Sequence, residues 1–137
     1  MRKGSPVKGP KQAKAPKQVP FPFVLELLEA LRPAVKPMFG LSAIYIGEKI
    51  VLILRNRDEH PEDNGVWVAT ALEHIESLQR EVTGMRSLAE FGGGVSSWQL
   101  LPLDSEDFET PVMRICDLIL RGDQRIGKIP KRKGKRL

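Results

Sequence analysis

The sequence predicts an α+β fold in which helices pack on a mostly antiparallel sheet. Three features indicate this class: apolar residues at helical spacing before residue 33, three short β-prone runs between residues 42 and 69, and a second helical stripe after residue 107. The predicted order of elements is helix, three strands, helix, two strands and helix. At 137 residues the chain has the length of one ordinary domain, which can bury a core without disulfides or metals.

The first helix is expected to follow two prolines, Pro20 and Pro22, which suit a helix entrance. Its apolar stripe follows the i, i+3, i+4, i+7 rule and consists of Val24, Leu27, Leu28 and Leu31. Pro33 and Pro37 end this pattern, because proline cannot continue a helix. Gly40 is then interpreted as the glycine at the helix exit.

Three strands are expected next. Two apolar runs, Ser42 to Ile46 and Ile50 to Leu54, are separated by "GEK", in which Gly47 can supply the positive φ of a tight hairpin. The third run, "GVWVA" at 65–69, follows the polar loop "RNRDEHPEDN", whose Pro, Asp and Asn residues break regular structure.

The second helix is expected to begin at a capping box formed by Thr70 and Glu73. Its apolar stripe would be Ala71, Ile75, Leu78 and Val82. Two weaker strands are expected around Met85 to Leu88 and Val95 to Leu101. The glycines of "FGGG" at 91–94 are interpreted as the turn between these strands, because no helix follows them as a phosphate-binding loop requires.

The last helix has the strongest pattern in the chain. Its apolar stripe consists of Phe108, Val112, Ile115, Cys116 and Ile119. Asp104 or Ser105 can cap its N-terminus, and Gly122 is expected to end it. A cysteine on such a stripe more often packs as a small apolar residue than reacts as a thiolate.

The net charge of +5 is distributed unevenly along the chain. Residues 1–20 contain six basic and no acidic side chains, and residues 121–137 contain eight basic side chains and one acid. The residues between them carry eight basic and 16 acidic side chains. Both ends have little to bury and are expected to be disordered. We therefore predict a basic tail at 1–20, a folded domain at 21–122 and a basic C-terminal tail at 123–137.

A group of short motifs resembles the N-terminal domain of the TfoX (Sxy) competence regulators. The resemblance covers roughly Val24 to Leu120 and rests on Met38, Phe39 and Gly40, on Tyr45 after a small residue, on Gly47, and on Leu101 and Pro102 before an acidic helix entrance. Leu41 and Ser42 stand where the family usually has another glycine, and no segment resembles the family's C-terminal domain. The resemblance implies an α+β fold like that of type III secretion chaperones and a non-enzymatic regulatory or binding role, with no catalytic residues.

The residue types that carry chemistry do not form a recognisable set in the sequence. His60 and His74 lack a second ligand pair at metal-binding spacing, so we expect no metal site. The loop carboxylates also lack the order of a calcium loop: Asp58, Glu59, Glu62 and Asp63. We expect neither catalytic residues nor a cofactor.

Two sets of residues are candidates for binding. Trp67 and Trp98 lie on predicted strands and could share one sheet face as a platform for a partner, although core packing is the alternative. The C-terminal tail contains a dense basic run, whose candidate nucleic-acid contacts are Lys131, Arg132, Lys133, Lys135 and Arg136. Binding through the tails would be driven by phosphate and blind to sequence; the alternative is that the tails only keep the chain soluble.

A single cysteine and the lack of a long apolar run predict a soluble, cytoplasmic protein. The first functional hypothesis is a regulatory module that binds an unidentified protein partner through its folded body. The second is a nucleic-acid-associated protein that contacts phosphates non-specifically through its basic tails.

Overall fold

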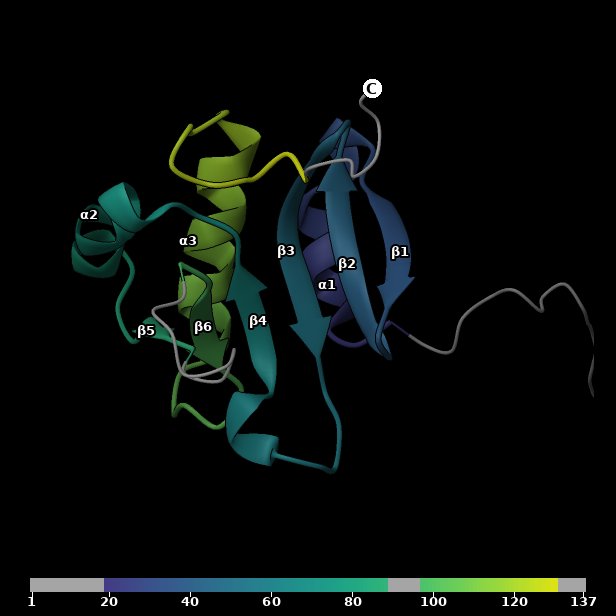
Figure 1. Cartoon of the computed structure of the whole chain (residues 1–137), viewed down its shortest axis with the longest axis vertical. Coiled ribbons are helices and arrows are strands. Elements are labelled where there is room, and N and C mark those ends of the chain that lie inside the picture. Colours follow the sequence, from purple (N-terminus) through teal and green to yellow (C-terminus); the bar gives the residue numbers. More distant parts are fainter. Residues whose placement is uncertain (1–18, 89–96, 131–137) are drawn as a thin grey trace, which may run out of the picture.

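The computed structural model of the chain describes residues 19–88 and 97–130. In these residues three α-helices pack on a six-stranded antiparallel sheet with the order β1-β2-β3-β4-β6-β5 (Figure 1). The elements, in chain order, are α1 (Pro22–Leu27), the 3-10 helix η2 (Glu29–Leu31), β1 (Ala34–Met38), β2 (Leu41–Ile46), β3 (Lys49–Arg55), η3 (Pro61–Asp63), β4 (Gly65–Val68), η4 (Leu72–His74), α2 (Ile75–Glu81), β5 (Arg86–Ser87), β6 (Gln99–Pro102) and α3 (Glu109–Leu120). The predicted α+β class and the antiparallel sheet are confirmed.

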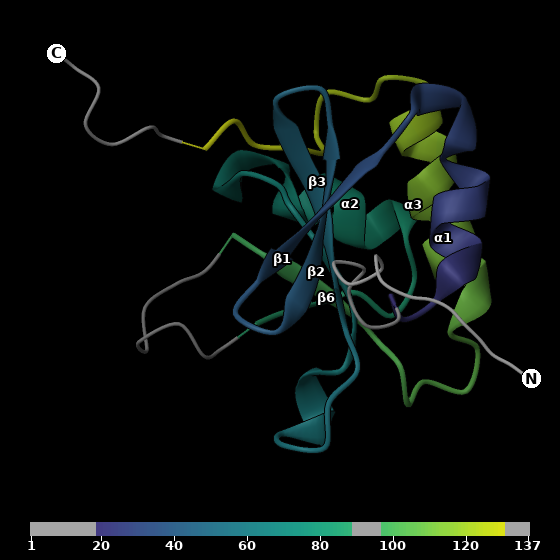
Figure 2. The ribbon, with the colours of Figure 1, turned by 90° about the vertical axis from the view of Figure 1, so that its right-hand side faces the viewer.

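The main apolar core lies between one face of the sheet and the helices. Helices α1 and α3 lie side by side on this face (Figure 2), and the rings of Phe21 and Phe108 join them with centroids 5.1 Å apart. The sheet contributes Ile44, Leu52, Leu54, Val66, Val68 and Leu101, and the helices contribute Val24, Leu28, Leu78, Val112, Ile115 and Ile119. Most residues of the predicted helical stripes therefore lie on the inner surface of the helix layer, whereas Leu27 and Ala71 are exposed.

Helix α3 carries its predicted stripe but begins later than expected. Neither Asp104 nor Ser105 caps it; Asp107 instead accepts a hydrogen bond from the Thr110 N–H at 3.3 Å, between its Oδ1 and the amide nitrogen. The prediction of the helix end is confirmed. Gly122 has φ 75° and donates to the Ile119 carbonyl at 3.0 Å, which is one of the two bonds of a Schellman motif.

The segment after Pro33 is a strand, and the interpretation of Gly40 as a helix exit is wrong. Ala34–Met38 forms the edge strand β1, which pairs with β2. Pro37 is compatible with this strand because an edge position leaves one side of the backbone unpaired. Gly40 instead lies in the two-residue turn between β1 and β2, whereas the predicted hairpin glycine, Gly47, has the expected positive φ of 64°.

The predicted capping box at the start of the second helix is also wrong. Thr70 is fully buried, and its hydroxyl donates to the carbonyl oxygen of Arg125 at 2.6 Å. The helical segment starts after Ala71 with η4, and no side chain caps it. The hydroxyl is committed to a residue 55 positions away, so it cannot also bond the first turn of the helix.

The chain remains folded beyond residue 122, so the predicted tail at 123–137 begins too early. Ile126 is 2% exposed and belongs to the main core. The Gly127 N–H donates to the Ala69 carbonyl at 2.7 Å, and Lys128 exchanges two backbone hydrogen bonds with Ile50, each of 2.9 Å. The folded body therefore extends to Lys128. The "FGGG" turn, the N-terminal residues 1–18 and residues 131–137 lie outside the described residues.

Candidate functional site

The two predicted tryptophans lie on the sheet face that α1 and α3 leave uncovered, which we call the outer sheet face. Trp67 on β4 pairs with Leu100 on β6, and Trp98 lies two residues before Leu100, so both indoles lie on the same side of the sheet. Trp67 is 6% exposed, and its indole N–H donates to the Asp63 carbonyl at 2.9 Å. Trp67 is therefore a core residue, whereas Trp98 is half-buried.

A second apolar cluster lies on the outer sheet face. Its buried members are Ala43, Ile50, Ile53, Trp67, Ala69, Leu88 and Leu100, and its half-buried members are Met38, Leu41, Tyr45 and Trp98. Because both faces of the central strands carry apolar side chains, β3 and β4 appear in the sequence as continuous apolar runs rather than as alternating ones.

Two lysines lie against aromatic rings on this face. The Lys36 ammonium is 4.5 Å from the ring centroid of Tyr45, and the Lys128 ammonium is 5.3 Å from a ring centroid of Trp98. These distances are typical of cation–π contacts. Lys128 also donates to the Ser97 hydroxyl at 2.5 Å, and burial lowers the pKa of its ammonium. Within residues 19–88 and 97–130 neither lysine forms an ion pair with a carboxylate.

The turn between β1 and β2 presents an exposed aromatic side chain. Phe39 and Gly40 are its two central residues, with φ 53° and φ 79°, which is the pattern of a type I′ hairpin. Phe39 is 89% exposed, the largest exposure among the large apolar side chains of the described chain. Arg57 holds the turn from the loop after β3: its guanidinium donates to the Phe39 carbonyl at 3.3 Å and pairs with Glu59 at 3.0 Å.

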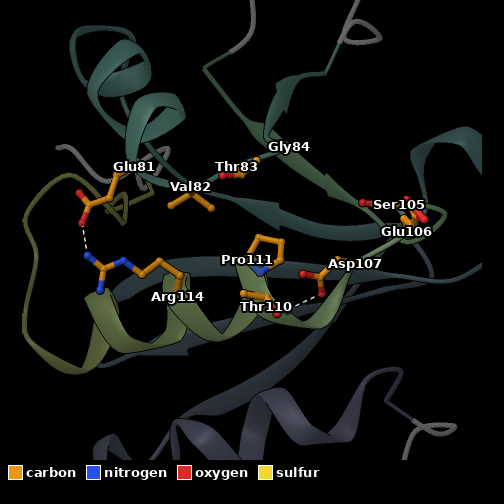
Figure 3. A pocket seen from close by; sticks show the side chains of 10 residues that line it. All are labelled: Glu81, Val82, Thr83, Gly84, Ser105, Glu106, Asp107, Thr110, Pro111 and Arg114. Carbon is orange, nitrogen blue, oxygen red and sulfur yellow. Dashed lines mark hydrogen bonds and ion pairs between the residues drawn. The ribbon is translucent and has the colours of Figure 1, made fainter.

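A groove with a cavity volume of about 510 Å³ lies between the end of α2 and the start of α3 (Figure 3). Its side chains include Glu81, Glu106, Asp107, Thr110 and Arg114. Figure 3 shows Glu81 and Arg114 facing one another, and they form an ion pair. The Arg114 guanidinium in the groove is therefore already paired with the Glu81 carboxylate.

Arg125 connects this groove to the C-terminal segment. Its guanidinium pairs with Asp123 and with Glu81, each at 2.7 Å, and donates to the Ser77 hydroxyl at 2.9 Å. Hydrogen bonds from Arg125 lower the pKa of Asp123 to about 2 and, together with those from Arg114, lower the pKa of Glu81. The network joins α2, α3 and the segment after α3.

This network predicts a loss of stability in acid. A carboxylate whose pKa is depressed on folding stabilises the protein above its ordinary pKa, and this contribution is lost as the pH falls through the folded value. For Asp123 that window runs from about 4 down to about 2. We expect the free energy of unfolding to fall between pH 5 and pH 2.5, and to fall less in Asp123→Asn. Urea titrations at both pH values measure it; an equal acid loss in the two proteins would show that the pair contributes nothing.

The two histidines and the cysteine lie on three different elements of the described chain. His60 has an exposed side chain beside Glu62, whereas the imidazole of His74 lies 3.7 Å from a Glu73 oxygen. Cys116 is buried, and burial raises the pKa of its thiol to about 12. Among the described residues no group of three His, Cys, Asp or Glu side chains could hold a metal ion.

No family model, curated protein or solved structure matches the chain. In the described part of the chain, no helix is long and apolar enough to span a bilayer. The predicted basic run at 131–136 lies outside the described residues. Sequence reasoning named Trp67, Trp98 and the "MFG" motif, but it missed Lys36 and Lys128 as neighbours of aromatic rings, because that proximity depends on strand pairing.

Proposed function

We propose that this protein is a non-enzymatic binding module similar to the N-terminal domain of the TfoX regulators, and that it binds a protein partner through the turn between β1 and β2. The "MFG" motif carries the sequence resemblance, and in the fold it forms this turn. A catalytic role has less support, because the buried Cys116 thiol has a raised pKa and the two histidines lie beside their own acidic neighbours.

The observation that carries the proposal is the exposure of Phe39 at a strained backbone position. Left-handed backbone at a bulky residue costs about 1–2 kcal/mol, and Asn or Asp fit the first central position of a type I′ turn better. Phe39 is 89% exposed and buries little within the fold to offset this cost. Burial of the ring in a partner would contribute about 1.5–3 kcal/mol, so binding gives this side chain a role that folding does not.

The substitution Phe39→Asn should therefore separate stability from binding. We expect the free energy of unfolding to rise by up to about 1 kcal/mol, because Asn tolerates left-handed backbone. A urea titration measures this change. A lower midpoint would show that the Phe39 ring supports the fold, and the proposed role of the turn would lose its basis.

Binding can be tested by photocrosslinking in an extract of the native cell. The full chain would carry benzoylphenylalanine at position 39 or, as a matched control, at the exposed position of Leu72. We expect a discrete crosslinked protein from position 39 and none from position 72. The crosslink should survive nuclease treatment. Excess wild-type chain should suppress it, whereas excess Phe39→Asn chain should not. Equal suppression by both competitors would contradict the proposal.

A second candidate function, non-specific nucleic-acid binding through the tails, is favoured by charge. Residues 1–18 contain six basic side chains and residues 131–137 contain five, and neither segment contains an acid. Such segments bind phosphates in a salt-dependent manner without reading sequence. Loss of the crosslink on nuclease treatment would favour this function over the first.

A further inference from the structure

We propose that the outer sheet face binds single-stranded nucleic acid along a row of side chains that we call the lysine–aromatic strip. The strip consists of Lys36, Tyr45, Ile50, Lys128 and Trp98. Phosphates would contact the two ammonium groups and draw them off the rings of Tyr45 and Trp98, and bases would then stack on these rings. The inference goes beyond tail-mediated binding, because it assigns base contacts to the folded body.

Strand pairing places these residues in one row. Tyr45 lies opposite Ile50 on the neighbouring strand, and Ile50 lies opposite Lys128 in the bridge that the C-terminal segment makes. Residues directly opposite one another share a face, and neighbouring strands are about 4.8 Å apart, so the backbones of Tyr45 and Lys128 are about 10 Å apart. The cation–π contacts add Lys36 at one end and Trp98 at the other.

The lysines of the strip differ from most arginines of the folded body in how their charge is compensated. Five arginines form ion pairs with carboxylates: Arg57, Arg80, Arg114, Arg121 and Arg125. Lys36 and Lys128 form none with the described residues. Burial lowers the pKa of the Lys128 ammonium, and no acid among the described residues pairs with it. An anionic ligand is complementary to this charge.

The sequence contains more positive charge shortly after Lys128. Lys131 follows Lys128 by three residues, and a chain segment of that length spans at most about 11 Å. Lys131 is the first of five basic residues in 131–136. The densest cationic run of the sequence therefore begins three residues after Lys128.

The aromatic rings select the class of nucleic acid. An antiparallel sheet with lysines and aromatic rings on one face suits single strands, whose unpaired bases can stack on the rings while the backbone follows the positive charge. A duplex hides its base faces and offers only phosphates. The strip therefore predicts a preference for single strands, which binding through the tails alone does not.

The test uses the full chain, fluorescence anisotropy and three probes: a labelled 15-nucleotide oligo-dT, a 15-base-pair duplex and inorganic polyphosphate as competitor. We expect oligo-dT to bind tighter than the duplex and to be displaced only weakly by polyphosphate. Tyr45→Leu should weaken oligo-dT binding by about 5- to 150-fold, the equivalent of losing one base–aromatic stack, whereas Tyr45→Phe should retain it.

The lysines are tested separately with a charge-matched control. Lys36→Gln with Lys128→Gln should lower the slope of log K against log salt by up to about 1.4, because each neutralised phosphate of a single strand contributes about 0.7. The double variant Arg32→Gln with Arg80→Gln removes two positive charges at positions outside the strip. It should bind oligo-dT more tightly than the double lysine variant does. The thermal transition of each variant shows whether it folds.

Three results would overturn the proposal. One is equal affinity for oligo-dT and duplex with full displacement by polyphosphate. In the second, the lysine double variant and Tyr45→Leu fold and bind oligo-dT as tightly as the wild type does. If binding is then abolished only when the five basic residues of 131–136 are changed to Gln, the tail alone carries the affinity. For the third, the full chain would carry benzoylphenylalanine at position 45; a crosslinked protein that oligo-dT does not displace would assign this face to a protein partner. None of these results depends on Phe39, so the turn proposal stands or falls independently.

Discussion

A chain that ends at Gly122 is expected to be far less stable than a chain that ends at Pro130. The longer chain keeps Ile126 in the core, where it is 2% exposed. It also keeps the Arg125 carbonyl that accepts the hydrogen bond of the buried Thr70 hydroxyl at 2.6 Å. Loss of a buried isoleucine costs about 2–5 kcal/mol, and an orphaned buried hydroxyl adds about 1–3 kcal/mol. These losses are a large fraction of the stability of an ordinary domain.

Urea denaturation followed by tryptophan fluorescence measures this difference, because Trp67 lies in the sheet. The chain that ends at Pro130 is the matched control, since it lacks the same basic run at 131–136 but keeps every described contact. We expect its midpoint to equal that of the full chain and the shorter chain to be largely unfolded without urea. Equal midpoints for both truncations would show that residues 123–130 do not support the fold.

The misplaced boundary at 122 shows what a count of charges cannot detect. The segment "RGDQRIGKIP" contains three basic residues and has the composition of a tail. One side chain, Ile126, anchors it in the core, and Gly127 and Lys128 pair with strands more than 50 residues earlier in the chain. Local sequence carries no signal for such distant partners, and the same pairing brings Lys128 onto Trp98.

The other errors have the same physical origin. Pro37 ends a helical pattern, but it is equally compatible with an edge strand, and only pairing with β2 decides between them. Thr70 has the spacing of a helix cap, but a distant carbonyl takes its hydroxyl. Periodicity, in contrast, located α3 and its buried stripe, because the burial of a helix face depends on local spacing.

The same difference between local and long-range signals applies to the candidate sites. Trp98 could be named from the sequence, since an aromatic residue on a predicted strand is a local feature, whereas the "MFG" motif could be named only by its resemblance and not as a turn. The positive φ of Phe39 could not be predicted, because the prolines before it indicate a helix end rather than a strand and hairpin. The strip of lysines and aromatic rings required both the sheet order and the C-terminal segment.

The last prediction concerns α3, whose stripe defines the helix layer. Ile115 is 0% exposed and belongs to the main core, so Ile115→Ala should lower the free energy of unfolding by about 2–4 kcal/mol through lost burial and a cavity. Met113 lies on the same helix at 49% exposure, so Met113→Ala is the matched control and should change stability by less than about 0.5 kcal/mol. Urea titrations of both variants give the comparison. Similar midpoints for the two variants would place Ile115 outside the core and contradict the packing of α3 on the sheet. A loss of stability confined to Ile115→Ala would support the helix layer, which leaves the outer sheet face as the uncovered one.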